Sequence, residues 1–226
     1  MIRIVKRRIE KHLFKTKPES LVPIEVTLRN GELTLEVFGR VKGIAKEFYK
    51  KHKMCPFSSE ALSFLENKME GVIRDWGYVT DDLMEGHIAT YIAKDINREA
   101  IQESTVMIKS SKGYVNLTEY ELEDIDMDSE ECYFVTIIDG KIVSVCETNS
   151  GDAFIGAKEI NVYTSPEYRG KGYAASNAAS MADYYKSLGY KVAYTSRMDN
   201  IASLKTAEKC GFERVAETFY YICYKE

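Results

Sequence analysis

Apolar and polar residues alternate in two stretches of the chain that predict β-hairpins. In residues 24–37, apolar side chains recur at every second position on both sides of Asn30-Gly31, a pair that favours the positive φ angles of a tight turn. Residues 132–147 surround Asp139-Gly140 in the same way. We therefore expect one hairpin near the amino terminus and another in the second half of the chain.

Apolar residues follow a helical spacing in three further segments. These are residues 41–49, 62–76 and 80–92. Ser58 and Ser59 stand where they can cap the second of them. Together with the first hairpin, these segments predict a hairpin-plus-helices region over residues 1–112.

The second half of the chain repeats strand and helix. The expected elements are a strand at 157–164, a helix that ends near Gly189, a strand at 191–196, a helix at 199–210 and a strand at 212–224. A strand that leads through a helix to a parallel neighbour crosses right-handed, which puts residues 165–172 at the carboxyl edge of the first strand. Residues 113–226 are therefore expected to form an α/β domain.

Composition and charge narrow the classes of partner. The chain has 226 residues, 45% of them hydrophobic, and its net charge of −4 lacks the basic excess typical of nucleic-acid or membrane-surface binding. No apolar stretch approaches the length of a membrane span. The five cysteines show no CxxC spacing and the three histidines no metal-ligand spacing. We expect a cytoplasmic protein without disulfides or a metal site.

Residues 165–174, with the sequence SPEYRGKGYA, are the strongest candidate for a binding site. The first backbone N–H groups of a helix have no partner inside the helix, and Gly170 and Gly172 remove side chains that would keep a ligand away from them. Arg169 and Lys171 add positive charge, although a solvated rim would explain them equally well. The turn therefore predicts a site for phosphate.

Three kinds of phosphate-binding loop compete for this turn. A Walker loop requires GxxxxGK(S/T), which the chain lacks. Residues 170–175 fit the GxGxxA pattern of a dinucleotide-binding fold, but residues 165–167 separate the strand from the glycines and too little chain follows to complete such a sheet. The third interpretation uses both flanks of the turn.

The turn and its flanks resemble the coenzyme A site of the GCN5-related N-acetyltransferases, the GNAT superfamily. Arg169, Gly172 and Ala174 match the family's (Q/R)-x-x-G-x-(G/A) signature. Asn200 and Gly211-Phe212 match its later N…GF element. Several short motifs in the right order are more specific than one.

The resemblance covers residues 114–226 and implies a fold. The fold is an α/β arrangement with a mixed, mostly antiparallel sheet flanked by helices. Its two central parallel strands, here about 159–164 and 191–195, splay apart, and the pantetheine arm of acetyl-CoA enters the gap between them.

The resemblance also implies which residues bind acetyl-CoA, with its pyrophosphate on the backbone amides of residues 170–174. The implied coenzyme-binding residues are Tyr163, Thr164, Arg169, Gly170, Lys171, Gly172, Tyr173, Ala174, Asn200 and Ser203. Asn200 has an alternative role as the N-cap of the following helix, where asparagine is favoured in any protein.

Acetyl transfer to an amine requires a neutral nucleophile and a donor for the oxyanion. An amine with a pKa of about 10.4 is charged at pH 7, and neutralising it costs about 4.6 kcal/mol, so a base is useful. The resemblance suggests Glu159 as the catalytic base with Glu147 in reserve, although the ordinary exposure of glutamate favours a solvent-facing strand carboxylate for either one. The oxyanion donor would be a backbone N–H near Tyr163 or Thr164.

The general acid of the family has no counterpart at its usual place. Many relatives carry a tyrosine four residues before the Gly-Phe pair, where this chain has Ala207. A thiol with a pKa of about 8.5 can leave as the thiolate. Tyr163, Tyr194 and Tyr220 are alternative donors among the 16 tyrosines of the chain.

The activity implied is the transfer of acetyl from acetyl-CoA to a primary amine of a small molecule or a peptide. The alternative is a regulatory or interaction module that binds acyl-CoA with little or no turnover. The dinucleotide interpretation predicts stabilisation by NAD instead of coenzyme A. Residues 1–112 are expected to supply an acceptor pocket, a lid or a homodimer surface, with neither nucleic acid nor membrane as a partner.

Overall fold

The structure, a computed structural model, describes residues 3–6, 20–80, 86–115, 117, 122–148 and 156–225. The chain forms two compact units, residues Met1–Ala89 with Val215–Glu226 and residues Thr90–Arg214. The boundary between them falls inside strands β6 (Gly86–Ala93) and β12 (Phe212–Tyr220). It differs from the predicted division at residue 112, and the functional roles assigned to the two predicted segments stay predictions.

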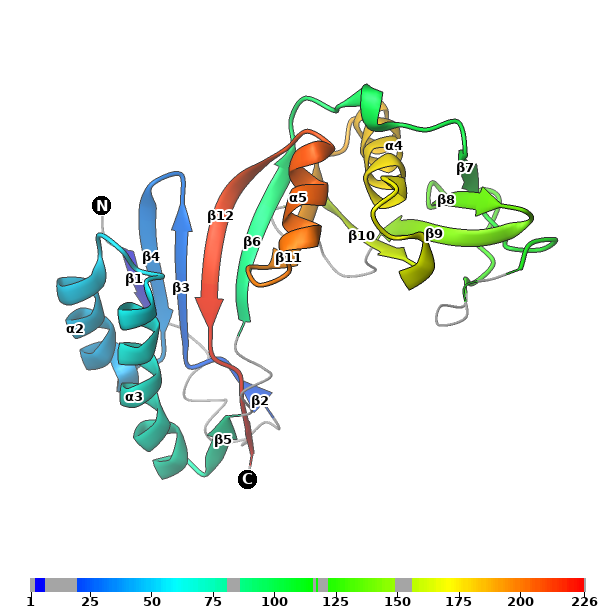
Figure 1. The fold of residues 1–226 in the computed structure, drawn as a ribbon. Coiled ribbons are helices and arrows are strands. Elements are labelled where there is room, and N and C mark those ends of the chain that lie inside the picture. The colour runs from blue at the N-terminus through cyan, green and yellow to red at the C-terminus, as the bar shows by residue number, and fades with distance from the viewer. Residues whose placement is uncertain are drawn as a thin grey trace. The chain divides into compact units, whose positions relative to one another are not determined.

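The first unit is built around the predicted amino-terminal hairpin (Figure 1). Its strands are β1 (Arg3–Lys6), β2 (Ser20–Leu21), β3 (Ile24–Arg29), β4 (Glu32–Val37), β5 (Tyr78–Thr80), β13 (Cys223–Lys225) and the end of β12. Asn30 and Gly31 turn the hairpin with φ angles of 50° and 78°, as their sequence predicts. The strand order is β1-β4-β3-β12, and a smaller sheet has the order β2-β13-β5.

Two helices of the first unit also follow the sequence pattern. They are α2 (Lys42–His52) and α3 (Ser59–Asp75), preceded by the 3-10 turn η1 (Gly39–Val41). The Ser58 hydroxyl accepts a hydrogen bond from the Ala61 N–H at 3.2 Å and so caps α3. The buried side chains of α3 recur every four residues at Ala61, Leu65, Met69 and Ile73.

The prediction of a third helix in this half of the chain, at residues 80–92, is wrong. Residues 86–93 form strand β6, and Leu83 and Met84 of the predicted pattern lie outside the described residues. Ala89, Thr90 and Tyr91 are buried in succession, so both faces of the strand are covered. A strand buried on both faces loses the two-residue alternation that would identify it.

The second unit holds a mixed, mostly antiparallel sheet with the order β6-β11-β10-β9-β8-β7. Its other elements are β7 (Thr105–Ile108), β8 (Tyr133–Ile138), β9 (Lys141–Thr148), β10 (Lys158–Thr164), β11 (Val192–Arg197), α4 (Tyr173–Ser187), α5 (Ile201–Lys209), η3 (Arg98–Ala100) and η4 (Pro166–Tyr168). The second hairpin, around Asp139 and Gly140, is confirmed, and so is the predicted fold class.

Helix α4 packs against strands β8, β9 and β10 of this sheet (Figure 1). Its buried face contains several alanines, which let the helix backbone approach the strands closely. They are Ala175, Ala178, Ala179 and Ala182. No helix in the described ranges combines the length and apolar character needed to cross a membrane.

Candidate functional site

Strand β10 is paired along its whole second half on one edge and opens on the other. Antiparallel pairing with β9 continues from Ile160 to Thr164. Among the described residues, the parallel pairing with β11 covers only Lys158, Glu159 and Ile160, although β11 itself runs on to Arg197. The central parallel strands therefore separate after Ile160, as the family resemblance implied.

The register shows which backbone groups of β10 face this opening. The Ser165 N–H donates to the carbonyl of Val143, the residue directly opposite, at 3.0 Å. In an antiparallel pair, such hydrogen-bonded positions alternate with positions whose N–H and C=O point the other way. Tyr163 therefore bonds toward β9, whereas Val162 and Thr164 direct their backbone groups toward the opening beside β11.

A cavity of about 660 Å³ lies at this opening. It is lined by the end of β10, the glycine turn, the first turn of α4, Tyr194 of β11 and one side of α5. The predicted coenzyme-binding residues that line it are Tyr163, Thr164, Arg169, Gly170, Gly172, Tyr173, Ala174, Asn200 and Ser203. Lys171 does not line it, and its ammonium lies 4.9 Å from the ring centre of Tyr168.

The glycine turn leads directly into the amino terminus of α4. Gly170 and Gly172 have φ angles of 77° and 86°, which glycine adopts without strain. Gly172 is the N-cap of α4, and no side chain of the described residues caps the helix there. The Arg169 guanidinium donates from Nε to the Thr164 carbonyl at 3.1 Å, which ties the turn to the end of β10.

The charge of the cavity wall is positive. Arg169, Lys205 and Lys209 line it, and none of the described lining residues is acidic. The positive end of the α4 dipole faces the same space. An anion is therefore stabilised here by both side chains and backbone, although the chain as a whole is acidic.

Asn200 and Ser203 have contacts within the protein. The Asn200 side chain accepts a hydrogen bond from the Ser203 N–H at 3.2 Å, so the N-cap alternative describes its contact in this structure. The Ser203 hydroxyl lies 2.9 Å from the Tyr194 hydroxyl. Burial raises the pKa of Tyr194 to about 12, which keeps this phenol protonated at neutral pH.

The three tyrosines considered as acids lie in different settings. Tyr163 and Tyr194 line the cavity. The Tyr163 ring also packs against a buried cluster that includes Val145. Tyr220 belongs to the first unit, where its ring covers Gly86 so closely that a Cβ atom there would lie 2.0 Å away.

Neither candidate carboxylate lines the cavity. Glu159 accepts a hydrogen bond from the Thr195 hydroxyl near the start of the parallel pairing. Glu147 lies opposite Asn161 in the ladder with β9 and lines a second, smaller cavity of about 320 Å³. Burial raises the pKa of the Glu147 carboxyl, against a hydrogen bond with Asn161 that acts in the opposite direction.

Comparison with known proteins decides the family. The sequence model of the Acetyltransferase (GNAT) family matches residues 96–212, more than half of the chain. This chain belongs to the GNAT family. The match starts before the predicted limit of residue 114 and ends at Phe212 of the GF element.

Solved structures with similar folds include other GNAT proteins. One from Novosphingobium aromaticivorans is 19% identical over 66% of this chain and 68% of its own, with a TM-score of 0.47. An N-acetyltransferase-like protein from Streptococcus suis is 19% identical over 92% and 85%, with a TM-score of 0.43. A third, from Colwellia psychrerythraea, is 12% identical over 70% and 62%, with a TM-score of 0.46. No curated protein sequence matches the chain.

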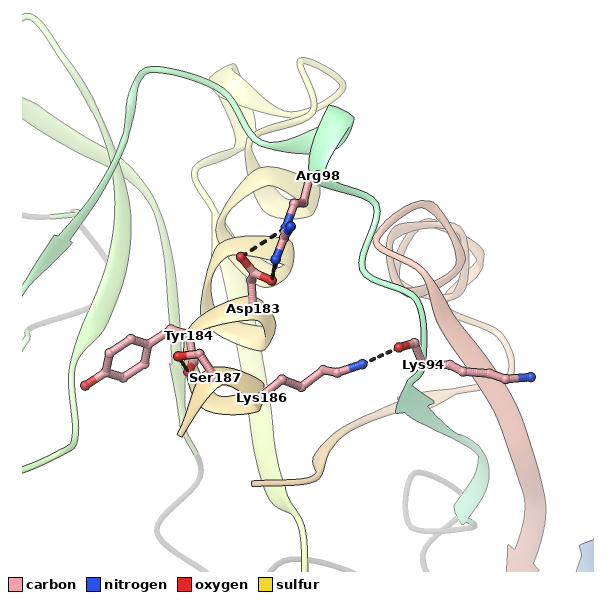
Figure 2. Close-up of polar contacts among 6 residues, drawn as sticks. All are labelled: Lys94, Arg98, Asp183, Tyr184, Lys186 and Ser187. Carbon is pink, nitrogen blue, oxygen red and sulfur yellow. Dashed lines mark hydrogen bonds and ion pairs between the residues drawn. The ribbon is translucent and has the colours of Figure 1, made fainter. Parts of the chain in front are cut away.

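The GNAT match begins inside a segment that the sequence patterns missed. Residues 94–102 run along α4 and the end of α5 as a strap (Figure 2). The Arg98 guanidinium pairs with the Asp183 carboxylate of α4 at 2.8 Å, and the Lys186 ammonium donates to the Lys94 carbonyl.

The carboxyl end of α5 requires Gly211 because the strap passes directly over it. A Cβ atom at Gly211 would lie 1.9 Å from the Asp95 carbonyl oxygen, and the residue has a φ of 87°. Gln102, at the other end of the strap, donates from Nε2 to the Lys171 carbonyl of the glycine turn at 3.0 Å. Gly211 was the one sequence signal for this contact, and nothing in the sequence pointed to Gln102.

The described residues were also compared with the ligand sets that hold metal ions in proteins. No cluster of three or more His, Cys, Asp or Glu side chains there has the arrangement of a metal site.

Proposed function

We propose that this GNAT protein transfers an acetyl group from acetyl-CoA to a primary amine of a small molecule or a peptide, in a ternary complex. The observation that carries the proposal is the opening of β10 and β11 after Ile160 into a cavity with cationic walls. Exposed backbone groups and a positive, carboxylate-free lining suit a long ligand that has amides at one end and phosphates at the other.

The proposed coenzyme pose follows from the two kinds of donor in the cavity. The amides of residues 170–174 bind the pyrophosphate, with Arg169, Lys205 and Lys209 around it. The pantetheine arm lies along the open edge of β10, where Val162 supplies the backbone groups that a neighbouring strand would otherwise use. Asn200 and Ser203 flank the arm from the start of α5.

The proposed chemistry is direct attack of the amine nitrogen on the thioester carbonyl carbon. The oxyanion is stabilised by the Thr164 N–H, because this group faces the opening whereas the Tyr163 N–H faces β9. The carbon–sulfur bond then breaks, and the coenzyme leaves as a thiolate with a pKa of about 8.5. Tyr194, with a pKa raised to about 12, donates a hydrogen bond to the sulfur rather than its proton.

The amine loses a proton when it forms the amide, and a base must accept that proton. Glu159 is the proposed base, on the same face of β10 as Tyr163 by strand alternation. Because no described carboxylate lines the cavity and Ala207 replaces the family tyrosine, a module that binds acyl-CoA without turnover is the second candidate.

Thiol release from acetyl-CoA across a panel of primary amines tests the proposal. Turnover that falls at least about tenfold in Glu159→Gln, with coenzyme affinity unchanged, supports catalysis with Glu159 as base. Glu99→Gln is the matched control, since this exposed carboxylate lies on the strap outside the cavity. Tight coenzyme binding without any thiol release would favour the binding module.

Thermal shift separates both candidates from a dinucleotide-binding protein. Coenzyme A should raise the melting temperature and NAD should not, because only a ligand that binds the folded state stabilises it. Stabilisation by NAD alone would contradict the proposal.

A further inference from the structure

A chain of hydrogen-bonded polar side chains crosses the core of the second unit beneath the cavity. Its members Thr136, Ser144, Ser176 and Asn177 are completely buried. Burying polar groups is costly unless each finds a partner, and networks that satisfy every member are rigid. None of these side chains has a buried polar atom without a partner.

Asn177 of α4 stands at the centre of this network. Its side-chain oxygen accepts hydrogen bonds from the hydroxyls of Thr105 at 2.9 Å and Thr136 at 3.0 Å. Its side-chain nitrogen donates to the Ser144 hydroxyl at 3.1 Å. With two hydroxyl donors on one side, the orientation of the amide is determined by its neighbours.

The network reaches the cavity through Ser144. The Ser144 hydroxyl donates its single proton to the Tyr163 carbonyl at 2.9 Å and lies 2.8 Å from the Thr164 hydroxyl. Because the Ser144 proton is already used, the Thr164 hydroxyl must be the donor in that contact. The Thr164 oxygen consequently presents only lone pairs to the cavity and can accept a hydrogen bond from a ligand.

The other branch of the network reaches the glycine turn. The Thr105 proton is used on Asn177, so the Ser176 hydroxyl donates to Thr105 at 2.6 Å. Ser176 in turn accepts a hydrogen bond from the Gln102 N–H at 2.7 Å. The Gln102 side chain holds the Lys171 carbonyl. The end of β10 and the glycine turn, which form two of the cavity walls, are therefore both connected to the side-chain amide of Asn177.

We propose that Asn177 is a positioning residue for the coenzyme site. It orients the Thr164 hydroxyl as an acceptor for an amide N–H of the bound coenzyme, and through Gln102 it holds the glycine turn at the distance the phosphates require. The inference rests on the proposed function. It adds to that function a residue that lies outside every motif of the sequence and that contacts no ligand.

Asn177→Leu tests the proposal, because leucine has the same number and branching of side-chain heavy atoms and removes all three hydrogen bonds. The dissociation constant for coenzyme A is measured by calorimetry at a temperature where circular dichroism shows every variant folded. We expect Asn177→Leu to weaken binding about fivefold to thirtyfold. Ser180→Ala is the matched control, since Ser180 is buried on the same helix outside the network, and it should leave binding unchanged.

A double-variant cycle distinguishes positioning from a purely structural role. If Asn177 acts through Thr164, then Asn177→Leu combined with Thr164→Val should bind coenzyme A within about twofold of Asn177→Leu alone. Losses that simply multiply would overturn the proposal. So would an Asn177→Leu variant that melts at a lower temperature but binds the coenzyme as tightly as the wild type.

Two further outcomes are also decisive. If Asn177→Leu does not fold, Ser144→Ala provides the same test. It removes the hydroxyl between Asn177 and Thr164 and leaves the branch through Thr105 and Ser176 intact. Weakened coenzyme binding then supports the proposal, and unchanged binding overturns it. If the wild type itself binds no coenzyme A, the proposed function fails and this inference fails with it. Wild-type binding that Asn177→Leu leaves unchanged overturns the inference alone.

Discussion

The two edges of strand β10 differ in how far they are paired with a neighbouring strand. On the β9 edge, pairing continues from Ile160 to Thr164, and each backbone group that faces β9 has a strand beside it. On the β11 edge, the pairing stops at Ile160 and a cavity begins. The comparison shows that a sheet can direct main-chain groups toward a cavity when the pairing on one edge of a strand ends early.

The difference arises from the alternation of backbone groups along a strand. Tyr163 and Ser165 use their groups on β9, so they hold the sheet together. Val162 and Thr164 point the other way, toward the opening, where the Thr164 carbonyl accepts a hydrogen bond from Arg169 Nε. We call the edge that faces β9 the closed edge and the edge that faces β11 the open edge. Substitutions at the closed edge should change stability, whereas substitutions at the open edge should change coenzyme affinity.

The largest effect is expected at the turn that begins on the open edge. Gly172→Glu would place a carboxylate where the pyrophosphate is proposed to bind, and we expect the dissociation constant for coenzyme A to rise about a hundredfold or more. Calorimetry measures it. A Cβ at Gly172 would meet only side-chain ends, Gln102 Nε2 at 2.9 Å and Lys209 Nζ at 3.5 Å, so the fold should survive.

Gly31→Glu is the control for the backbone strain of Gly172→Glu. Gly31 has a similar positive φ of 78° and nothing within 4 Å of its Cβ position, but it lies in the β3–β4 turn. It should lower the melting temperature by a similar amount and leave coenzyme binding alone. Equal loss of binding in both variants would mean that strain, not the added charge, causes the effect.

The next effect belongs to the closed edge. Val145 lies opposite Tyr163 and is 1% exposed, so Val145→Ala leaves a void in the sheet's apolar cluster. We expect it to lower the free energy of unfolding by about 2 kcal/mol, measured by urea denaturation, with coenzyme affinity unchanged. A large loss of affinity at full folding would show that the two edges are not independent.

A smaller effect is expected from the cations of the cavity wall. Lys209→Ala should weaken coenzyme binding about threefold to tenfold at low salt and less at high salt, because salt screens exposed charges. Titrations at two ionic strengths measure the change. Lys191→Ala, just before β11 and outside the cavity, should change neither value.

The smallest effect concerns Glu147 on the closed edge. Folding raises its pKa above the usual value of 4.5, so the folded protein holds a proton that the unfolded chain releases, and stability falls as the pH rises through that interval. Glu147→Gln should remove this loss and raise the melting temperature at pH 7 by about 1 °C, with little difference at pH 4. A variant less stable than the wild type at pH 7 would contradict the sign of the shift.

Local sequence was sufficient for most of the elements and for one wall of the site. Asn30-Gly31 and Asp139-Gly140 predicted their hairpins because few other pairs adopt positive φ at low cost. Gly170 and Gly172 identified the turn. Arg169, Gly172 and Ala174, with the later N…GF element, identified the family, because each motif lies within a short segment. Those residues carry their signal in their own backbone preferences, wherever the rest of the chain lies.

Only the tertiary structure decided where pairing stops and what supports the cavity. Strand β6 was mistaken for a helix because neighbours cover both of its faces, and burial by distant residues erases the local pattern. Gln102 and Asn177 join the site through contacts with residues about 70 and 30 positions away in the chain, so no spacing rule could find them. Neighbouring residues determine the local conformational preference of a segment, whereas a hydrogen-bond network between distant segments forms only when the chain folds.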